Sequence, residues 1–209
     1  KKKIPLQKKK FTSYSNLQKK SSSILKKIII LTLLLYQSDT FSNDMILDQL
    51  KNPKITNQSQ KWNFITDQVM GGVSTGKFMV ETVDGVLCYR MTGDVSTKNN
   101  GGFIQMRTKL SPEINSKDYD GVYLKVYGNK KNYNLHLRTG LTLAPWQYYS
   151  YTFTTKNNWI EIRAPFEQFK KSNFYQPKNI LGQSIKSVGL VAGFDNFSSD
   201  ICLSEIGFY

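Results

Sequence analysis

The sequence predicts an all-β protein, folded as an antiparallel jelly-roll β-sandwich. Three observations carry this prediction. After Trp62, short segments alternate apolar and polar residues, which is the pattern of half-buried strands. Turn-forming residues such as Asp84-Gly85 separate these segments at short intervals. No apolar pattern in that region has a helical period over a domain-sized length. At 209 residues the chain is long enough for one ordinary domain with extensions.

Residues 1–40 have the composition of a targeting leader. Residues 1–37 carry ten Lys and no Asp or Glu, and they include the apolar run Ile28–Tyr36. A positive segment, an apolar run too short to cross a bilayer and small polar residues predict a signal peptide and export to a bacterial periplasm. A mitochondrial presequence and a buried strand are the alternatives. Because the sequence does not begin with Met, a start near Leu25, with residues 1–24 untranslated, is a further alternative.

The net charge of +14 is concentrated in this leader. Residues 38–209 hold 19 Lys and Arg against 15 Asp and Glu. A nucleic-acid surface needs its basic residues clustered on the folded part of the chain. We therefore expect no nucleic-acid partner, and we expect membrane contact only through the leader.

Residues 41–61 are predicted to be a linker or a strap across the domain that follows. The segment is polar with scattered apolar residues, and Phe41–Leu50 has the spacing of a short amphipathic helix that Pro53 would end. The β-domain is expected to occupy residues 62–209.

Within residues 62–209, the predicted strands follow one another at short spacing. Lys77–Val83 alternates and reaches Asp84-Gly85, which predicts a hairpin with Val86–Met91 as the return strand. The signals Ser111-Pro112 and Gly128–Asn132 predict loops, and Pro165–Phe169 predicts a short excursion at an edge. Seven further segments predict the remaining strands: Gly101–Lys109, Val122–Tyr127, Tyr133–Arg138, Gln147–Thr154, Trp159–Arg163, Ser187–Ala192 and Ile201–Tyr209.

The segment Gly71–Lys77 has the glycine and lysine spacing of a phosphate-binding loop. Such a loop needs Ser or Thr after the lysine to hold Mg²⁺, and a helix whose N-terminus faces the phosphates. Here Phe78 follows the lysine, and the next residues alternate as a strand does. We therefore expect no nucleotide or other cofactor, and we interpret the glycines as turn formers.

Few residue types in the sequence could support catalysis or hold a metal. His136 is the only His, and Cys88 and Cys202 are far apart with no CxxC motif, so we expect no metal site, no catalytic triad and no enzyme activity. Both Cys lie in predicted strands. They could form a disulfide if those strands are neighbours, and two separate buried thiols are the alternative.

The outward positions of several predicted strands carry polar and aromatic side chains. If these strands are neighbours, a sugar ring could pack on the aromatic rings while its hydroxyls form hydrogen bonds with the polar groups. An ordinary solvated sheet face is the alternative. Glu161 is the only acid of the set, whereas a glycosidase needs two. The candidate ligand face consists of Gln105, Arg107, Tyr123, Lys125, Tyr127, His136, Arg138, Glu161 and Arg163.

Several blocks of residues 62–209 have the order and spacing of a known family. The most distinctive block is Asp67–Ser74, and further blocks include Gly93–Ser96, Gly101–Phe103, Tyr119–Val122 and Ser187–Leu190. On these blocks the domain resembles the complex I intermediate-associated protein 30 family, which has a galactose-binding-like jelly roll. The family signature loop comprises Trp62, Asp67, Met70, Gly71, Gly72 and Ser74.

The resemblance implies a non-enzymatic domain that acts in the assembly of respiratory complex I, or as a chaperone for it, with no catalytic residues to carry over. One departure is Lys171–Tyr175, which stands where the family usually has Arg-Gly. An exported carbohydrate-binding module is the alternative, so the expected partner is a protein or a glycan. Within the signature loop, Asp67 is predicted to accept backbone hydrogen bonds, and Gly71-Gly72 to permit the turn.

Overall fold

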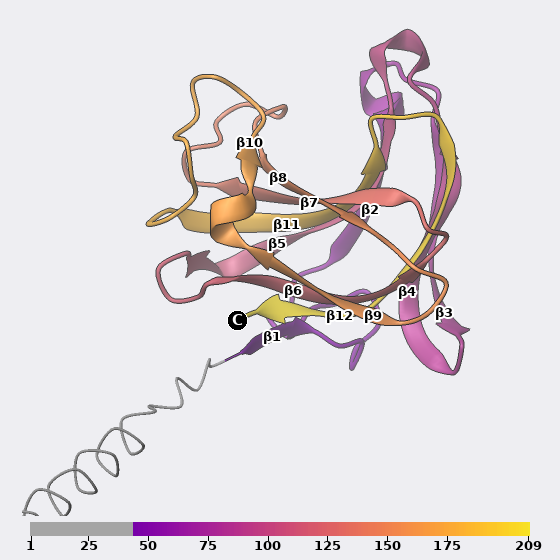
Figure 1. Ribbon diagram of the computed structural model, residues 1–209, viewed down its shortest axis with the longest axis horizontal. Coiled ribbons are helices and arrows are strands. Elements are labelled where there is room, and N and C mark those ends of the chain that lie inside the picture. The colour runs from indigo at the N-terminus through magenta and orange to yellow at the C-terminus, as the bar shows by residue number, and fades with distance from the viewer. Residues whose placement is uncertain (1–43) are drawn as a thin grey trace, which may run out of the picture. The chain divides into compact units, whose positions relative to one another are not determined.

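Two antiparallel β-sheets face each other in the part of the chain that the computed structural model describes, residues 44–209 (Figure 1). The predicted leader and residues 41–43 lie outside the described residues. Helical structure in the described part is limited to the short 3₁₀ helices Asp67–Met70 (η1), Lys98–Asn100 (η2) and Phe166–Gln168 (η3). None of the described helices has the length and apolar character needed to cross a membrane. The predicted all-β jelly roll is confirmed.

Sheet I contains the strand that is last in the sequence, β12, at its centre. The sheet runs in the order β3-β4-β12-β6-β9, and β1 pairs with the end of β12 that β4 does not reach. Its strands are β1 (Met45–Asp48), β3 (Thr75–Val83), β4 (Val86–Val95), β6 (Gly121–Gly128), β9 (Ile160–Pro165) and β12 (Phe197–Phe208).

Sheet II runs in the order β10-β8-β7-β11-β5-β2. Its strands are β2 (Trp62–Thr66), β5 (Phe103–Asn115), β7 (Asn132–Thr139), β8 (Tyr149–Thr154), β10 (Lys170–Lys171) and β11 (Ser184–Gly193). In this register Gly189 of β11 is opposite Arg107 of β5 on one side and His136 of β7 on the other. The register therefore determines which side chains share a row on the face turned away from the core, here called the outer face.

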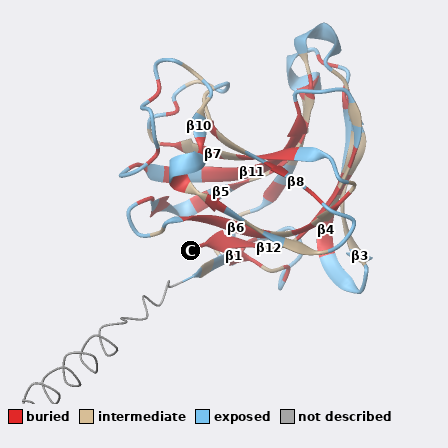
Figure 2. Ribbon diagram, viewed as in Figure 1, coloured by how far each residue is buried: buried red, intermediate tan, exposed pale blue. Residues whose placement is uncertain are grey.

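The core lies between the two sheets, and alternation along each strand decides which side chains enter it (Figure 2). In β7, for example, Tyr133, Leu135 and Leu137 are fully buried, whereas His136 and Arg138 lie on the outer face. The largest fully buried side chains are Tyr89, Tyr133, Tyr149, Phe166 and Phe208. Burial of such rings is the main favourable contribution to folding, and it leaves the opposite side of each strand available for function.

All nine predicted strands are present, with bounds that differ by a few residues. The predicted hairpin joins β3 to β4 through Asp84 and Gly85, whose φ angles of 48° and 78° both lie in the left-handed region. Such a turn matches the twist of the strands that it connects. The strands β1, β2 and β10 were not predicted.

Two sequence predictions are wrong. The amphipathic helix Phe41–Leu50 is replaced, in its described part, by strand β1, because the free edge of β12 accepts Met45 and Ile46 as partners. The sheet therefore begins before the predicted domain start at Trp62. The loop at Ser111-Pro112 lies inside β5, which is irregular at this point but pairs again with β11 at Ile114.

Candidate functional site

The signature loop is built around Asp67, a carboxylate with no solvent exposure. It accepts hydrogen bonds from the amide and hydroxyl of Ser74, at 2.9 and 2.5 Å, and from the amides of Gly102 and Phe103, at 2.5 and 3.3 Å. Burial raises the pKa of Asp67, but these hydrogen bonds outweigh that effect, and the net pKa is lowered. Asp67 thus joins the segment after η1 to the start of β5.

The glycines of the signature loop are required by this arrangement. Gly71 has a φ of 89° and ends η1, which is a conformation that glycine adopts without strain. A Cβ atom on Gly72 or on Gly101 would overlap the carboxyl group of Asp67. Strand β3 begins at Thr75, so no helix follows these glycines as a phosphate-binding loop would require. Trp62, also of the signature loop, donates its indole N–H to Asp48 at 2.6 Å.

The remaining residues of the signature loop divide between core and surface. Ser74 is buried and accepts a hydrogen bond from the amide of Ser96 at 3.0 Å, whereas Met70 is exposed. The polar members of the loop therefore form structural contacts with one another and with the neighbouring chain segments.

The nine residues of the candidate ligand face do not share one surface, because the strands that carry them belong to two sheets. Tyr123, Lys125, Tyr127, Glu161 and Arg163 lie on β6 and β9 of sheet I. Gln105, Arg107, His136 and Arg138 lie on β5 and β7 of sheet II. The expectation of a single neighbouring set is corrected here: the face separates into two groups.

The group on sheet I is engaged in contacts within the domain. Lys125 Nζ lies 3.2 Å from Glu205 Oε1, and Arg163 Nε lies 2.8 Å from Glu161 Oε1. Burial raises the pKa of the Tyr123 hydroxyl, and Glu205 raises it further. These partners satisfy the polar groups that a ligand on sheet I would need.

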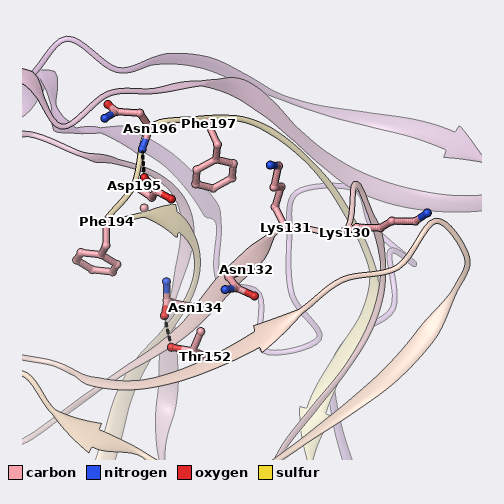
Figure 3. Close-up of a pocket in the computed structure, with 10 residues that line it drawn as sticks. Lys130, Lys131, Asn132, Asn134, Thr152, Phe194, Asp195, Asn196 and Phe197 are labelled. Atoms are coloured by element: carbon pink, nitrogen blue, oxygen red, sulfur yellow. Dashed lines mark hydrogen bonds between the residues drawn. The ribbon is translucent and has the colours of Figure 1, made fainter.

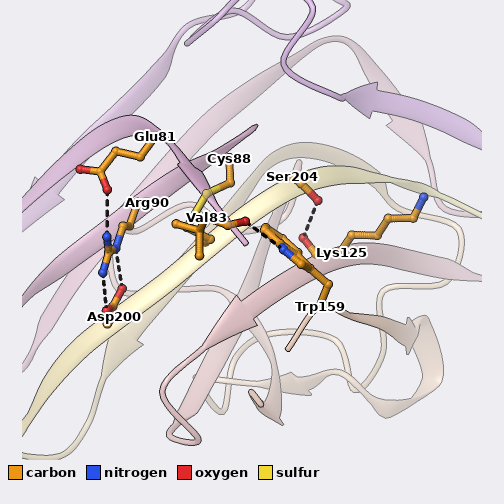
Figure 4. Close-up of a disulfide and its surroundings, with 9 residues drawn as sticks. Glu81, Val83, Cys88, Arg90, Lys125, Trp159, Asp200 and Ser204 are labelled. Atoms are coloured by element: carbon orange, nitrogen blue, oxygen red, sulfur yellow. Dashed lines mark hydrogen bonds and ion pairs between the residues drawn. A yellow bond between two sulfur atoms is a disulfide. The ribbon is translucent and has the colours of Figure 1, made fainter. Parts of the chain in front are cut away.

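A disulfide, the ring of Trp159 and the ion pairs of Arg90 with Glu81 and Asp200 lie on the same outer face (Figure 4). Cys88 of β4 and Cys202 of β12 are joined, with their Cα atoms 5.5 Å apart, and both are buried. Trp159 donates its indole N–H to the carbonyl of Val83 at 3.2 Å, and its ring centre lies 5.8 Å from that of Tyr127. Sheet I therefore offers few free polar groups.

The group on sheet II is arranged differently, around a position with no side chain. Gly189 separates Arg107 from His136 in the register. A Cβ atom on Gly189 would lie 3.5 Å from Cβ and Cγ of Arg107 and from Oε1 of Gln105. Glycine at this position therefore leaves Arg107 and His136 facing each other across one strand.

We call Arg107, His136 and Arg138 the basic cluster. Burial lowers the pKa of His136 to about 3, so its ring is neutral near pH 7. Burial also lowers the pKa of Arg138, and the charge of Arg107 lowers it further. Arg138 donates through Nη2 to the carbonyls of Thr142 and Ala144, at 3.3 and 2.9 Å. The cluster is a partly buried positive site that the protein does not neutralise with an acid.

An aromatic cluster lies beside it, formed by His136, Tyr148 and Phe194. The rings of His136 and Tyr148 are stacked, with centres 3.9 Å apart and planes at 12°. The ring of Phe194 lies 5.9 Å from His136 and 6.5 Å from Tyr148. Flat rings held in this way are the surfaces on which apolar faces of ligands pack.

Phe194 also lines a pocket of about 420 Å³, which we call the Phe194 pocket (Figure 3). Its wall includes Asn134 and Thr152, and Asn134 Oδ1 accepts a hydrogen bond from Thr152 Oγ1 at 2.7 Å. The amide nitrogen of Asn134 is directed away from Thr152, toward the side of Phe194 (Figure 3). Lys131 and Asp195 add charged groups at the rim. The volume lies within the range of small-molecule sites, and the lining combines the rings of Phe194 and Phe197 with a majority of polar and charged residues.

The backbone holds Phe194 in an unusual conformation. Its φ is 71°, which is rare for a bulky residue. The loop is fixed by a hydrogen bond from the amide of Phe194 to Gly102 at 2.8 Å, and by one from the amide of Thr97 to Asn196 Oδ1 at 2.9 Å. Strained residues of this kind often occur at functional sites, and here the result is an aromatic ring that is 60% exposed.

Five residues of the site, Lys131, Asn134, Tyr148, Thr152 and Phe194, are not among the site residues predicted from the sequence. Phe194 lies just after β11, where alternation assigns no face, and Tyr148 precedes β8, which begins two residues later than the predicted strand Gln147–Thr154. Tyr148 could have been noticed from the run of aromatic residues before β8. Phe194 could have been noticed because it is a large apolar residue directly before the turn-forming pair Asp195-Asn196. Over residues 44–209, no group of three or more His, Cys, Asp or Glu is placed to hold a metal ion.

A family model described as complex I intermediate-associated protein 30 matches residues 50–204. The match covers most of the chain and includes the signature loop, the basic cluster and the Phe194 pocket. No curated protein matches the sequence.

Solved structures of carbohydrate-binding modules share the fold. One is the family 11 module of a cellulosomal cellulase of Clostridium thermocellum, with a TM-score of 0.61 and 14% identity over 79% of this chain and 93% of the module. A second structure, a family 11 module from Clostridium thermocellum in complex with a β-1,3-1,4-mixed-linked tetrasaccharide, has a TM-score of 0.60 and 14% identity over 79% and 94% of the two chains. At this identity the similarity establishes the fold alone.

Proposed function

This chain belongs to the complex I intermediate-associated protein 30 family, and we propose that it is a non-catalytic domain that binds a glycan at the Phe194 pocket. The family and the sandwich fold support non-catalytic binding in general. The observation that carries the finer proposal is the Phe194 pocket beside the aromatic cluster.

The chemistry of this site suits a sugar. A pyranose ring has apolar C–H faces that pack on aromatic rings, and its hydroxyls require donors and acceptors at the edge. Phe194 supplies an exposed ring, while Asn134, Thr152 and Lys131 supply polar groups along the same wall. The module of the same fold from Clostridium thermocellum was solved with a tetrasaccharide, which supports the choice of an oligosaccharide as ligand.

The test is titration of the protein with a panel of soluble polysaccharides. We expect at least one to bind, and we expect Phe194→Ala to weaken that binding about tenfold or more because the stacking ring is lost. Phe174→Ala is the matched control, since it removes an exposed ring outside the pocket. The proposal fails if no polysaccharide binds, or if both variants bind as the wild type does.

A second candidate is the role that the family description names, a function in complex I assembly through a protein partner. One observation favours it: an apolar loop cluster of large exposed side chains, Leu143 (86%), Trp146 (66%), Phe174 (84%) and Tyr175 (88%). Exposed apolar residues that gather in this way often mark protein interfaces.

Hydrogen bonds join the loop that carries Leu143 and Trp146 to the loop that carries Phe174 and Tyr175. Ser172 donates its hydroxyl to the carbonyl of Trp146 at 3.0 Å and its amide to the carbonyl of Tyr148 at 2.9 Å. Gln176 donates to the same Tyr148 carbonyl at 3.1 Å. These hydrogen bonds fix the two loops that carry the apolar loop cluster relative to each other, which favours a defined protein interface.

Co-purification with respiratory complex I subunits tests this candidate. The double variant Trp146→Ala/Phe174→Ala should lose the partner while Phe194→Ala keeps it. Recovery of the protein without any of these subunits would count against an assembly role.

We also propose that the protein is exported, with residues 1–40 as its signal peptide. The Cys88–Cys202 pair supports this, because disulfides persist in oxidising compartments such as the periplasm. Cell fractionation combined with N-terminal sequencing of the mature protein tests the proposal. An uncleaved chain in the cytoplasm would contradict it, and a cleaved chain in mitochondria would favour the alternative leader.

A further inference from the structure

The basic cluster has no acidic counterpart. Arg107 and Arg138 take part in none of the ion pairs formed within residues 44–209. On the outer face, the residues of β2, β11, β7 and β8 that are in register with Gln105, Arg107 and Lys109 of β5 include no Asp or Glu. The two arginines are close enough that Arg107 lowers the pKa of Arg138. Like charges held together cost free energy unless an anion offsets them.

The same cluster contains unsatisfied buried nitrogen atoms. Among the described residues that are not exposed, the buried side-chain polar atoms without a hydrogen-bond partner are His136 Nε2 and Arg138 Nε. Nearly all buried polar groups in folded proteins have a partner, and an exception calls for an explanation such as a bound ion. Both atoms belong to side chains of β7 that are two residues apart and lie on the outer face of sheet II.

Gly189 provides access between these groups. It lies in register between Arg107 and His136, and Ser187, two residues earlier on β11, is opposite Arg138. A guanidinium group presents parallel N–H donors that match the two oxygens of a carboxylate or sulfate. Gly189 therefore places no side chain between the guanidinium group of Arg107 and the ring of His136.

We propose that the basic cluster is a subsite for an oxyanion carried by the glycan, so that the ligand is an acidic polysaccharide bearing carboxylate or sulfate groups. This inference rests on the proposed glycan-binding function. The aromatic cluster links the two parts of the site, because His136 belongs to it and to the basic cluster, and Phe194 belongs to it and to the Phe194 pocket. One sugar unit packs at Phe194, and the charged substituent of the same or the next unit reaches Arg107.

The experiment uses pairs of polymers that share a backbone and differ in charge. Polygalacturonate is compared with its methyl-esterified form, and dextran sulfate with dextran, by calorimetric titration at physiological salt, which screens long-range attraction. These two pairs separate a carboxylate from a sulfate as the bound group. Polyglutamate is included as an acidic peptide.

The matched variants are Arg107→Gln and Arg163→Gln. Each removes one positive charge from the outer face of a sheet, but Arg163 lies on sheet I, beside Glu161. The side chain of Arg107 forms no hydrogen bond or ion pair within residues 44–209, and its backbone pairing in β5 does not depend on the side chain. Its replacement should therefore leave the fold intact, and an unchanged melting temperature verifies this.

We expect one charged polymer to bind about tenfold or more tightly than its uncharged form, because charge-assisted hydrogen bonds are the strong ones. Arg107→Gln should remove most of this difference, and Arg163→Gln should keep it. Equal binding of charged and uncharged polymers would overturn the anion subsite and leave the glycan proposal standing. Equal losses in the two variants would also overturn it, since only the net charge would then matter. Binding to no polysaccharide would overturn both proposals, and binding to polyglutamate alone would assign the site to a protein ligand.

Discussion

Asp67 shows how one buried residue can define a loop. Its carboxylate accepts hydrogen bonds from three amides and one hydroxyl, and the glycines at 72 and 101 make room for it. The Asp67–Ser74 block therefore forms hydrogen bonds within the domain, as predicted for Asp67, and a tight turn, as predicted for Gly71-Gly72.

Asp67→Ala should lower the free energy of unfolding by about 3 kcal/mol, because several donors lose a buried acceptor. Gly72→Val should also lower the melting temperature, since its side chain would overlap Asp67. Thermal melts of both variants measure the effect, with Asp118→Ala, an exposed acid, as control. If both variants melt like the wild type, the signature loop has a functional rather than a structural role.

His136 gives the domain a specific dependence on pH. Its pKa is about 3 in the folded protein and about 6.5 in the unfolded chain, because burial of the ring against Tyr148 and Phe194 disfavours the charged form. Between these values the unfolded chain binds the proton and the folded protein does not. The contribution of His136 to stability is therefore complete above pH 6.5 and is lost as the pH falls toward 3.

Urea unfolding at pH 7 and pH 5 tests this expectation. The wild type should lose about 2 kcal/mol more than His136→Gln between these two values. Most carboxylates stay ionised in this window, so they affect both proteins alike. Equal losses in the two proteins would show that His136 titrates normally.

The site was only partly predictable from residue pattern. Alternation correctly assigned Arg107, His136 and Arg138 to the outer side of their strands. It could not assign strands to sheets, because neighbours in a jelly roll are distant in sequence, and so Tyr123 and Arg163 were grouped with them. Residues in loops, such as Phe194, obtain their role from tertiary hydrogen bonds that no local pattern encodes.

At the scale of elements, the disulfide fastens two neighbouring strands of sheet I. Cys88 and Cys202 are separated by 114 positions in the sequence. Closing so long a loop restricts the unfolded chain, so reduction should lower the free energy of unfolding by about 2–4 kcal/mol. Urea unfolding with and without reductant measures this, and thiol titration confirms that the bond has opened.

The double variant Cys88→Ser/Cys202→Ser is the control, because its stability should not respond to reductant. Wild-type curves that coincide in both conditions, once the thiols have been counted, would show that β4–β12 pairing alone holds these strands.

The strands that the sequence predicted are those with strong alternation and clear turns, such as β3, β4, β6 and β7. Strand β1 was mistaken for a helix, since an apolar segment of this length fits both periods. The segment forms a strand because it pairs with the free edge of β12, and this pairing cannot be read from the local sequence. Strand β5 was predicted to end before Pro112, whereas its pairing with β11 carries it to Asn115.

At the scale of the whole molecule, the segment before Trp62 is part of the domain. Leu47 and Leu50 enter the core, and Asp48 accepts hydrogen bonds from Trp62 at 2.6 Å and from Tyr89 at 3.0 Å. A chain that begins at residue 51 should therefore be less stable than one that begins at residue 44, by about 3 kcal/mol or more. Equal melting temperatures would show that residues 44–50 do not stabilise the domain.

The central place of β12 in sheet I has a consequence for how the chain is made. Every other strand of this sheet is translated before Phe197, yet β4, β6 and β1 all pair with β12. Sheet I cannot form completely until β12 has been synthesised, because β12 is its central strand. Nascent chains that stop before Phe197 should thus remain open to protease, whereas longer released chains become resistant. Late completion of sheet I is compatible with the export that we propose above, because a chain that crosses a membrane through a protein pore must be unfolded.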